Sequence, residues 1–289
     1  MLARALAALV GLAALPLVGS YLGALHPLGD SLAAFRLQGA GLLALVSLMA
    51  LMAGAARAGR LGMVAALVAG VPLAWAYQSG AAPGGDLRLY QKNMLFRNDD
   101  LAGLAADIRA AAPDVVTLQE VSEPNRPLMS ALADVLPHQL WCPFAAVGGP
   151  AVLTRLAPVP GQQVCAPGLA ALQVTGPEGP LWLVSVHLHW PWPHGQASHV
   201  QALLPVLERM QAPVDMAGDF NMVPWSAALA ALRGATGTRH AGPVRGTYTG
   251  FAPWATLPID HVLAPGGGVV ETRPRLGSDH LGLWADLSL

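Results

Sequence analysis

The stretch Gly218-Asp219-Phe220-Asn221 follows residues 214–217, a short apolar run that predicts a buried strand. In an extended turn, residues two apart face the same way, so we expect Asp219 and Asn221 to point into one pocket. A carboxylate there can orient and deprotonate a water molecule, and an amide can position that water. The pattern also suits an Asx turn that caps the next helix, and on this stretch alone both interpretations stay open.

Two later fragments carry similar side chains, Ile259-Asp260-His261 and Ser278-Asp279-His280. Asp260 and His280 suit a dyad in which a buried carboxylate orients an imidazolium and raises its pKa. A purely structural hydrogen bond between two strand ends is the alternative interpretation. Asp279 points the other way from His280 on an extended chain, and we expect it to be able to reach a metal ion.

Three further polar residues, Asn93, Glu120 and His187, lie at the ends of runs that predict strands. Glu120 comes just after the apolar residues 115–118, where a carboxylate is costly to bury unless it is paired or binds a cation. A solvent-facing glutamate at a strand end is the alternative. His187 ends the run Trp182-Leu-Val-Ser-Val-His187, where an isolated histidine is more often a structural residue.

Strand and helix patterns alternate through the C-terminal two thirds of the chain. This alternation predicts an α/β fold, and the polar residues above lie where loops on rigid strands build active sites. The expected strands are residues 87–93, 115–118, 151–153, 169–174, 181–188, 214–217, 259–263 and 280–287, and the expected helices are 99–112, 127–136, 196–210 and 225–232.

The N-terminal quarter has a different composition. Three apolar runs, residues 5–25, 37–56 and 61–77, each come close to the roughly 20 residues that cross a bilayer. A cleaved signal peptide is the alternative for the first run. The predicted parts are a membrane anchor with three transmembrane helices at 1–79, a linker at 80–86 and a folded domain at 87–289.

Basic residues in short loops predict the orientation of such an anchor. Arg4, Arg57 and Arg60 flank one end of the apolar runs, whereas Asp30 and Arg36 lie in the other loop. The three arginines are therefore expected on the cytoplasmic side. This places the folded domain outside, which in a bacterium means a multi-pass inner-membrane protein with a periplasmic domain.

Charge and cysteine content add two expectations. Residues 81–289 hold 12 Lys and Arg against 16 Asp and Glu, a net charge of −4, and Lys92 is the only lysine of the chain. No basic face for duplex binding is evident. Cys142 and Cys165 form either one disulfide, which would stabilise the fold by about 3 kcal/mol, or two buried thiols.

The order of the polar motifs is more specific than any one of them. It resembles the endonuclease/exonuclease/phosphatase superfamily, over about residues 86–289. The motifs are Gln91-Lys-Asn93, Leu118-Gln-Glu120, Val184-Ser-Val-His187-Leu, Gly218-Asp-Phe-Asn221, Pro258-Ile-Asp-His261 and Gly277-Ser-Asp-His280. Trp225-Ser226 and Arg245-Gly-Thr-Tyr248 are similar to its bacterial membrane-tethered branch. The resemblance implies a four-layer α/β sandwich of two mixed sheets flanked by helices.

The resemblance also implies roles for the candidate residues. Glu120 would bind Mg²⁺ or Mn²⁺, with Asn93 and Asp279 in or near its coordination sphere. Asp219 would activate the attacking water. His280, held by Asp260, would stabilise the transition state. Residues expected to contact the substrate are Asn93, His187 and Asn221, of which Asn221 would also position the water.

The expected function is a membrane-anchored, divalent-metal-dependent hydrolase of phosphate esters, a phosphodiesterase or nuclease that uses a metal-assisted activated water. The alternatives are a sphingomyelinase-like phospholipid head-group phosphodiesterase and a non-catalytic membrane scaffold of the same fold. The substrate stays undecided between nucleic acid and a lipid head group. Membrane contact is expected through residues 5–77, and the sequence indicates no protein partner.

Overall fold

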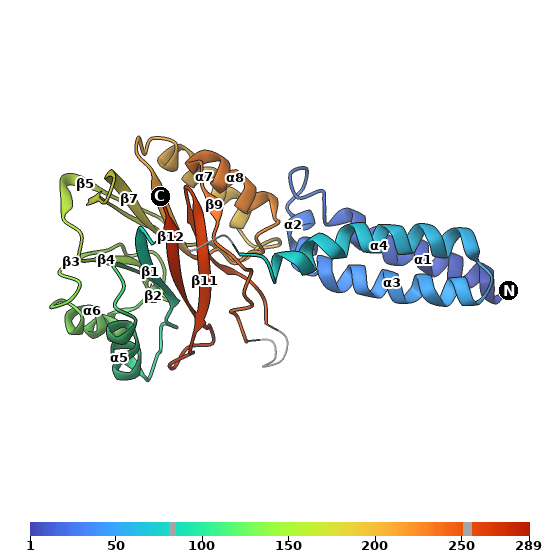
Figure 1. Ribbon diagram of the computed structural model, residues 1–289, viewed down its shortest axis with the longest axis horizontal. Helices are drawn as coiled ribbons and strands as arrows, with labels where there is room; N and C mark the ends of the chain where they lie inside the picture. The colour runs from blue at the N-terminus through green and yellow to red at the C-terminus, as the bar shows by residue number, and fades with distance from the viewer. Residues whose placement is uncertain (81–84, 251–255) are drawn as a thin grey trace.

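The computed structural model describes residues 1–80, 85–250 and 256–289. A slender helical bundle projects from a wider body of two sheets (Figure 1). The bundle is made of α1 (Leu2–Gly19), α3 (Arg36–Met52) and α4 (Ala56–Ala76), with the short α2 (Leu28–Ala33) where it meets the sheets. Four of the seven residues of the expected linker, 81–84, lie outside the described residues.

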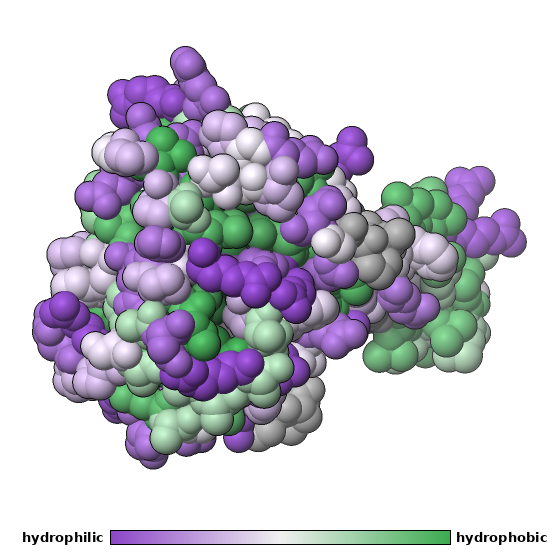
Figure 2. Space-filling view, turned by 60° about the vertical axis from the view of Figure 1, so that its left-hand side comes forward, coloured by the Kyte–Doolittle hydropathy of each residue, from purple (hydrophilic) through white to green (hydrophobic). Residues whose placement is uncertain are grey.

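Two of the described helices are long and apolar enough to cross a membrane, α1 with 18 residues and α4 with 21. Only 17% and 28% of their apolar windows are buried within the chain, which is unlike a core helix of a soluble protein. The middle apolar run forms α3, which has 17 residues, so among the described helices two of the three predicted spans have the required length. The bundle surface is largely hydrophobic, at the right of Figure 2.

The first apolar run ends earlier than expected, because α1 stops at Gly19 and residues 20–27 form turns. We call residues 20–35 the docking segment. Asp30 accepts hydrogen bonds from the main-chain N–H groups of Ala227 (2.8 Å) and Ala228 (2.9 Å) at the start of α8 (Ala227–Thr236). The docking segment thereby ties the bundle to the two-sheet body at a helix N-terminus.

The two sheets have six strands each, in the orders β11-β12-β1-β2-β4-β3 and β5-β6-β7-β8-β10-β9. Both are mixed, since β1–β2 and β7–β8 are parallel pairs and the other pairs between named strands are antiparallel. The strands are β1 (Leu87–Asn93), β2 (Val115–Val121), β3 (His138–Trp141), β4 (Gly149–Thr154), β5 (Pro158–Ala166), β6 (Leu169–Gly176), β7 (Gly179–His187), β8 (Val214–Asp219), β9 (Arg239–His240), β10 (Asp260–Ala264), β11 (Gly267–Arg273) and β12 (Gly282–Ser288).

Helices cover the outer face of each sheet (Figure 1). One hydrophobic cluster, with Leu89 and Leu183, fills the space between the sheets. A second joins the first sheet to α5 (Leu101–Ala111) and α6 (Pro127–Ala131), and a third joins the second sheet to α7 (Gln196–Leu207) and α8. Two mixed sheets flanked by helices are the arrangement that the sequence predicted.

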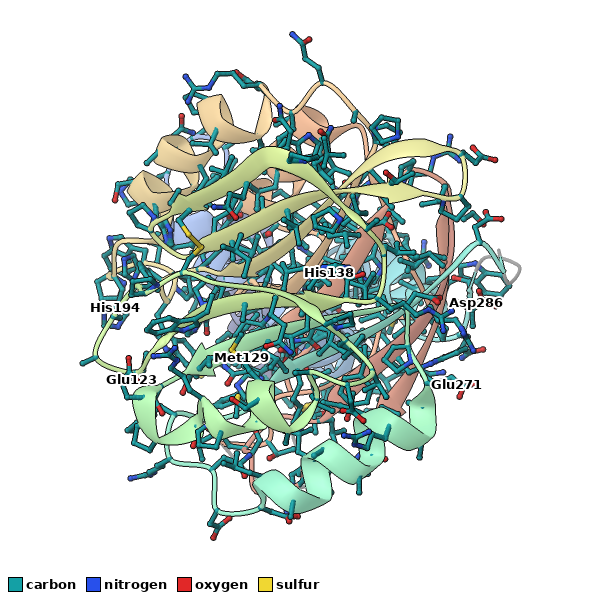
Figure 3. All side chains as sticks on the ribbon, turned by 90° about the vertical axis from the view of Figure 1, so that its left-hand side faces the viewer. Glu123, Met129, His138, His194, Glu271 and Asp286 are labelled. Atoms are coloured by element: carbon teal, nitrogen blue, oxygen red, sulfur yellow. A yellow bond between two sulfur atoms is a disulfide. The ribbon has the colours of Figure 1, made fainter. Side chains whose placement is uncertain are left out.

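Strand register brings the polar motifs to one edge of the body. Asn93 pairs with Gln119 across β1 and β2, and Asp219 pairs with both His187 and Asp260 across β7, β8 and β10. Figure 3 shows the loops after β2 and β7, marked by Glu123 and His194, at one edge, and Glu271 and Asp286 at the other. The ends of both parallel pairs therefore meet at the same edge.

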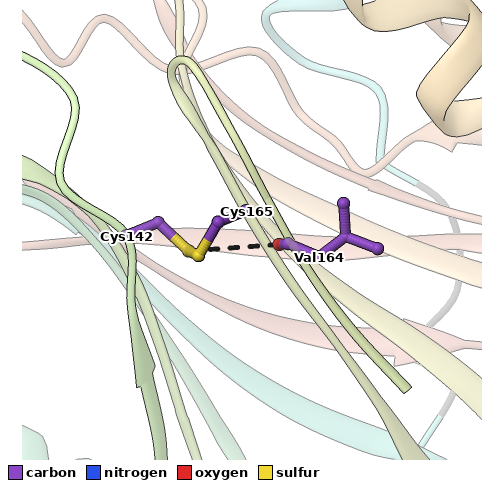
Figure 4. Close-up of a disulfide and its surroundings, with 3 residues drawn as sticks. All are labelled: Cys142, Val164 and Cys165. Atoms are coloured by element: carbon purple, nitrogen blue, oxygen red, sulfur yellow. Dashed lines mark hydrogen bonds between the residues drawn. A yellow bond between two sulfur atoms is a disulfide. The ribbon is translucent and has the colours of Figure 1, made fainter. Parts of the chain in front are cut away.

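Some predicted elements differ from those observed. The strands β3, β5, β9 and β11 were not predicted, and the helix expected at 127–136 ends at Ala131. The helix expected at 225–232 begins at Ala227, because the Ser226 side chain accepts a hydrogen bond from the Leu229 N–H and caps it. Cys142 and Cys165 are joined by a disulfide, so the two-thiol alternative is wrong (Figure 4).

Candidate active site

Asp219 lies at the centre of the polar cluster, at the end of β8, and is 2% exposed. Its Oδ1 accepts the Asn221 main-chain N–H at 2.8 Å, and its Oδ2 accepts the Asn93 amide at 3.0 Å. The Nε2 atoms of His187 and His280 lie 3.7 Å and 3.8 Å from the same Oδ2. One carboxylate oxygen therefore faces two imidazole rings and one amide.

His280 and Asp260 form the predicted dyad. Nδ1 of His280 lies 2.7 Å from Oδ2 of Asp260, and the Gln91 amide donates to Oδ1 at 2.8 Å. Burial alone would lower the pKa of His280, but the carboxylates of Asp260 and Asp219 raise it to about 9. Because Nδ1–H bonds Asp260, the Nε2–H of the imidazolium points to the side of Asp219.

The pKa values of the other two central groups shift with burial. Burial and the Asp260 carboxylate raise the pKa of Asp219, against the opposing charge of His280. Burial lowers the pKa of His187, which is 7% exposed, and Glu120 opposes that shift. A carboxylate with a raised pKa beside a stable imidazolium is the pairing that general acid–base chemistry needs near neutral pH.

Glu120 and Asn93 lie beside Asp219 at the end of the other parallel pair. The Asn93 amide donates to Oε1 of Glu120 at 3.2 Å as well as to Asp219, so the two carboxylates flank one amide. The Phe96 main-chain N–H donates to Oε2 of Glu120 at 2.9 Å. Glu120 has a φ of +58°, an uncommon backbone region for glutamate that is held here by these contacts.

Asn221 also has a positive φ, of +50°, and its amide group donates to the Leu188 main-chain oxygen at 2.8 Å. Its Oδ1 has no hydrogen-bond partner among the described residues although it is buried, and the same is true of Nδ1 of His187. Buried polar atoms without partners are costly. Both atoms are thus available to a bound group.

Gly218 lets the two parallel strands approach at the site. A Cβ atom at this position would collide with the main-chain oxygen of Val186 on β7. This strand contact sets the position of Asp219 next to His187, its partner in the register. The glycine of the motif is therefore required by the close contact of β7 and β8.

Among the described contacts, the carboxylate of the predicted site residue Asp279 makes no hydrogen bond to the cluster. It is half-buried, and its main-chain oxygen accepts hydrogen bonds from the N–H and hydroxyl of Thr249. Its negative charge still affects the pKa of a neighbouring side chain. Burial raises the pKa of Tyr248, and the carboxylates of Asp279, Asp219 and Glu120 raise it further.

The donor set suits a divalent cation. Atoms of Asp219, Asp260 and His280 lie within 4.8 Å of one another, a buried group that could hold a metal ion. Nδ1 of His280 is bonded to Asp260, however, so the oxygen-rich side of the cluster, with Glu120 and Asp219, fits better. Carboxylate and amide oxygens are the ligands that Mg²⁺ prefers. Asn221, whose Oδ1 has no partner among the described residues, is hydrogen-bonded to Asp219 through its main-chain N–H.

Several supporting residues were not assigned a role from the sequence. Gln91 bonds Asp260, and Gln196 bonds the main-chain oxygen of Phe220 within the Asp219 motif. Nζ of Lys92 is fully buried and donates to the main-chain oxygens of Pro274, Arg275 and His280. In the sequence, the only indication of a role for Gln91 and Lys92 was their position directly before Asn93 in the same motif.

Comparison with known proteins gives a family match. Residues 90–280 match the model of the Endonuclease/Exonuclease/phosphatase family. No curated protein sequence matches the chain significantly.

Three solved structures illustrate the shared fold. A truncated TDP2 of Caenorhabditis elegans has a TM-score of 0.55 at 14% identity, over 71% of this chain and 98% of that one. A Staphylococcus aureus beta toxin mutant with bound magnesium ions has a TM-score of 0.54 at 12% identity, over 71% and 100%. Sphingomyelinase C from Streptomyces griseocarneus has a TM-score of 0.50 at 19% identity, over 69% and 98%.

At these identities the structural likeness shows the fold alone. The family model covers residues 90–280, well over half of the chain, and spans the cluster from Asn93 to His280. This chain belongs to the Endonuclease/Exonuclease/phosphatase family.

Proposed function

We propose that this protein is a membrane-anchored, divalent-metal-dependent hydrolase of phosphate esters that acts as a phosphodiesterase. One observation carries the proposal: a buried carboxylate, Asp219, lies within 3.8 Å of two imidazoles, and Asp260 keeps one of them protonated. Family membership supports the reaction class, and a TDP2 complexed with a single-strand DNA product and a sphingomyelinase are among the proteins of similar fold.

Glu120 would hold Mg²⁺ or Mn²⁺, with Asn93 and Asp279 nearby. When bound, this ion would neutralise charge on the phosphate and lower the pKa of a water molecule. The Mg²⁺ ions bound to the beta toxin are consistent with such use. Which ion is used in the cell is a matter for metal analysis of the purified protein.

The protein's own groups would carry the proton transfers. Asp219 accepts a proton from the attacking water as the new P–O bond forms, which its raised pKa favours. The opposite P–O bond breaks, and Nε2–H of His280 donates to the developing oxyanion of the leaving group. Asn93 and His187 would contact the phosphoryl oxygens, His187 through its unpartnered Nδ1 when that atom carries a proton. The unpartnered Oδ1 of Asn221 is an acceptor and would position the attacking water.

The anchor would consist of three spans within residues 1–79, with α1, α3 and α4 as the membrane helices, a linker at 80–86 and the catalytic domain at 87–289. Arg4, Arg57 and Arg60 lie at the end of the bundle away from the sheets, which favours that end as the cytoplasmic one. The catalytic domain would then lie in the periplasm of a bacterial inner membrane.

The full-length protein in detergent tests the proposal with bis-p-nitrophenyl phosphate and Mg²⁺. We expect hydrolysis that EDTA abolishes and that Asp219→Asn reduces by about 10²-fold or more, the usual contribution of a general base. The control is Asp134→Asn, an exposed carboxylate paired with Arg109, with unchanged activity. Hydrolysis that ignores both EDTA and Asp219→Asn would refute the proposal. Absence of both activity and Mn²⁺ binding would instead support the scaffold alternative.

A further inference from the structure

The two-sheet body is fixed on the bundle at several points and does not hang from the linker alone. Besides the bonds from Asp30 to α8, the Trp225 indole donates to the Ala33 main-chain oxygen at 2.8 Å. Ala33 is fully buried within the hydrophobic cluster of α7 and α8. Val244 N–H donates to the Ala76 oxygen at the end of α4. These contacts fix the position of the candidate active site relative to the bundle.

Exposed aromatic side chains mark the end of the bundle next to the sheets. Tyr21 follows α1, Phe35 precedes α3, and Trp75 lies in the last turn of α4, and each of them is exposed. Tryptophan and tyrosine gather at the head-group level of membranes. We therefore expect the head-group level of the leaflet on the side of the two-sheet body to pass through these three residues.

The loop at residues 188–195 connects this level with the catalytic residues. It begins directly after His187, and its Trp192 lies 6.3 Å, ring to ring, from His26 of the docking segment. The Ser31 hydroxyl donates to the Trp192 main-chain oxygen at 2.8 Å. Trp192 is 44% exposed, which is unusual for so large an apolar side chain.

The same loop reaches the dyad through a second aromatic pair. Trp190, 41% exposed, lies 5.7 Å from the ring of Tyr248, and Tyr248 lies 5.0 Å from the ring of His280. The two exposed indoles thus lie on the loop that joins the docking segment to Tyr248, the ring beside His280. Residues 188–199 contain no lysine or arginine, so this stretch offers an apolar surface and no charge pairing for a polyanionic strand.

We propose that the substrate is an amphiphilic phosphate ester, a lipid of the membrane that holds the bundle, whose head group reaches Asp219 along Trp192, Trp190 and Tyr248. This inference rests on the proposed function and names its substrate class. The apolar part of the lipid near the head group contacts the two indoles while the phosphate enters the polar cluster. The net charge of −4 for residues 81–289 is consistent with a substrate that is not nucleic acid.

Two chromogenic diesters with one reacting group test this inference, methyl p-nitrophenyl phosphate and dodecyl p-nitrophenyl phosphate. The full-length protein in nanodiscs is assayed with Mg²⁺ on both. We expect kcat/KM for the dodecyl ester to exceed that for the methyl ester at least tenfold. The ratio of the two values cancels any loss of folded enzyme, because both esters report on the same active fraction.

Variants separate recognition by the indoles from simple partitioning into the nanodisc. Trp190→Ala and Trp192→Ala should each lower the ratio at least fivefold, whereas the exposed Val135→Ala should leave it unchanged. A ratio near one in the wild type, or a ratio that neither tryptophan variant lowers, would overturn the inference. So would a higher kcat/KM on single-stranded or plasmid DNA than on the dodecyl ester. If neither ester is hydrolysed, the proposed function fails first, and this inference fails with it.

Discussion

Replacing Asp260 with asparagine tests the dyad most directly. In the wild type, Oδ1 of Asp260 accepts from the Gln91 amide and Oδ2 from His280. Asparagine must turn its single oxygen towards the Gln91 donor, so that its own NH₂ faces Nδ1 of His280. A proton on that ring nitrogen is then disfavoured, and the imidazolium loses the carboxylate that stabilises it most.

The size of the effect follows from the pKa of His280. With a pKa of about 9, roughly nine tenths of the rings are protonated at pH 8. Without Asp260 the pKa of His280 falls, because burial lowers it and the carboxylate that raises it most is gone. A fall to the ordinary histidine value of about 6.5 would leave about 3% protonated at pH 8. We therefore expect Asp260→Asn to lower kcat/KM by roughly 30-fold at pH 8 and only about twofold at pH 6.5 from protonation alone.

The folding stability should depend on pH in the matching direction. The pKa of His280 is higher in the folded protein, about 9, than in an unfolded chain. Its stabilising contribution, roughly 3 kcal/mol, is therefore full below pH 6.5 and is lost as the pH rises through 9. The difference in unfolding free energy between wild type and Asp260→Asn should shrink over that range.

The assay is the pH–rate profile for bis-p-nitrophenyl phosphate with saturating Mg²⁺, from pH 5.5 to 9.5, for wild type and Asp260→Asn. The control is Asp134→Asn, which should follow the wild-type curve at all pH values. The reasoning is refuted if the defect of Asp260→Asn is the same at pH 6.5 and pH 8, because the loss would then not come from the protonation of His280.

Three further variants test the supporting contacts. Lys92→Met leaves three main-chain oxygens without their donor, of which the oxygen of His280 makes a buried hydrogen bond, and should cost about 3 kcal/mol in unfolding free energy. The exposed Arg209→Met should cost nothing measurable in urea denaturation. Asp30→Ala removes both acceptors at the start of α8 and should lower the unfolding free energy by about 1 to 2 kcal/mol. Each kcal/mol corresponds to roughly 2–4 °C in Tm, and an unchanged Tm would contradict the docking described above. Cys165→Ser should lower the unfolding free energy by about 3 kcal/mol, and the reduced wild type should be as stable as this variant. A variant as stable as the oxidised wild type would contradict a stabilising effect of the disulfide.

The sequence predicted the parts of the fold that apolar runs and strand ends encode. The runs before Asp219 and His187 are short and strongly apolar, so their strands and the gathering of their polar ends could be inferred. The strand β5 has prolines, a glycine and mostly exposed side chains, and β11 begins with two glycines, which conceals both patterns. Their pairing depends on neighbours that only the folded chain provides.

Long-range polar contacts are the part of the site that the sequence could not predict. Glu120, Asp219 and His280 lie at or beside recognisable strand ends, and the structure brings them to one edge. No local pattern indicates that Lys92 would bond residues more than 180 positions away, or that Asp30 would cap α8. The order of the motifs identified the family, while these contacts depend on the three-dimensional fold.

The docking segment has a practical consequence for anyone who trims the chain to a soluble piece. A fragment that starts after residue 80 lacks Asp30, which accepts from the N–H groups of Ala227 and Ala228. It also lacks Ala33, whose main-chain oxygen accepts from the Trp225 indole and whose side chain is buried in the core. A synthetic peptide of residues 28–34 should therefore bind such a fragment in trans. In this respect the stretch between the first two apolar helices serves the enzyme as a covalently attached subunit.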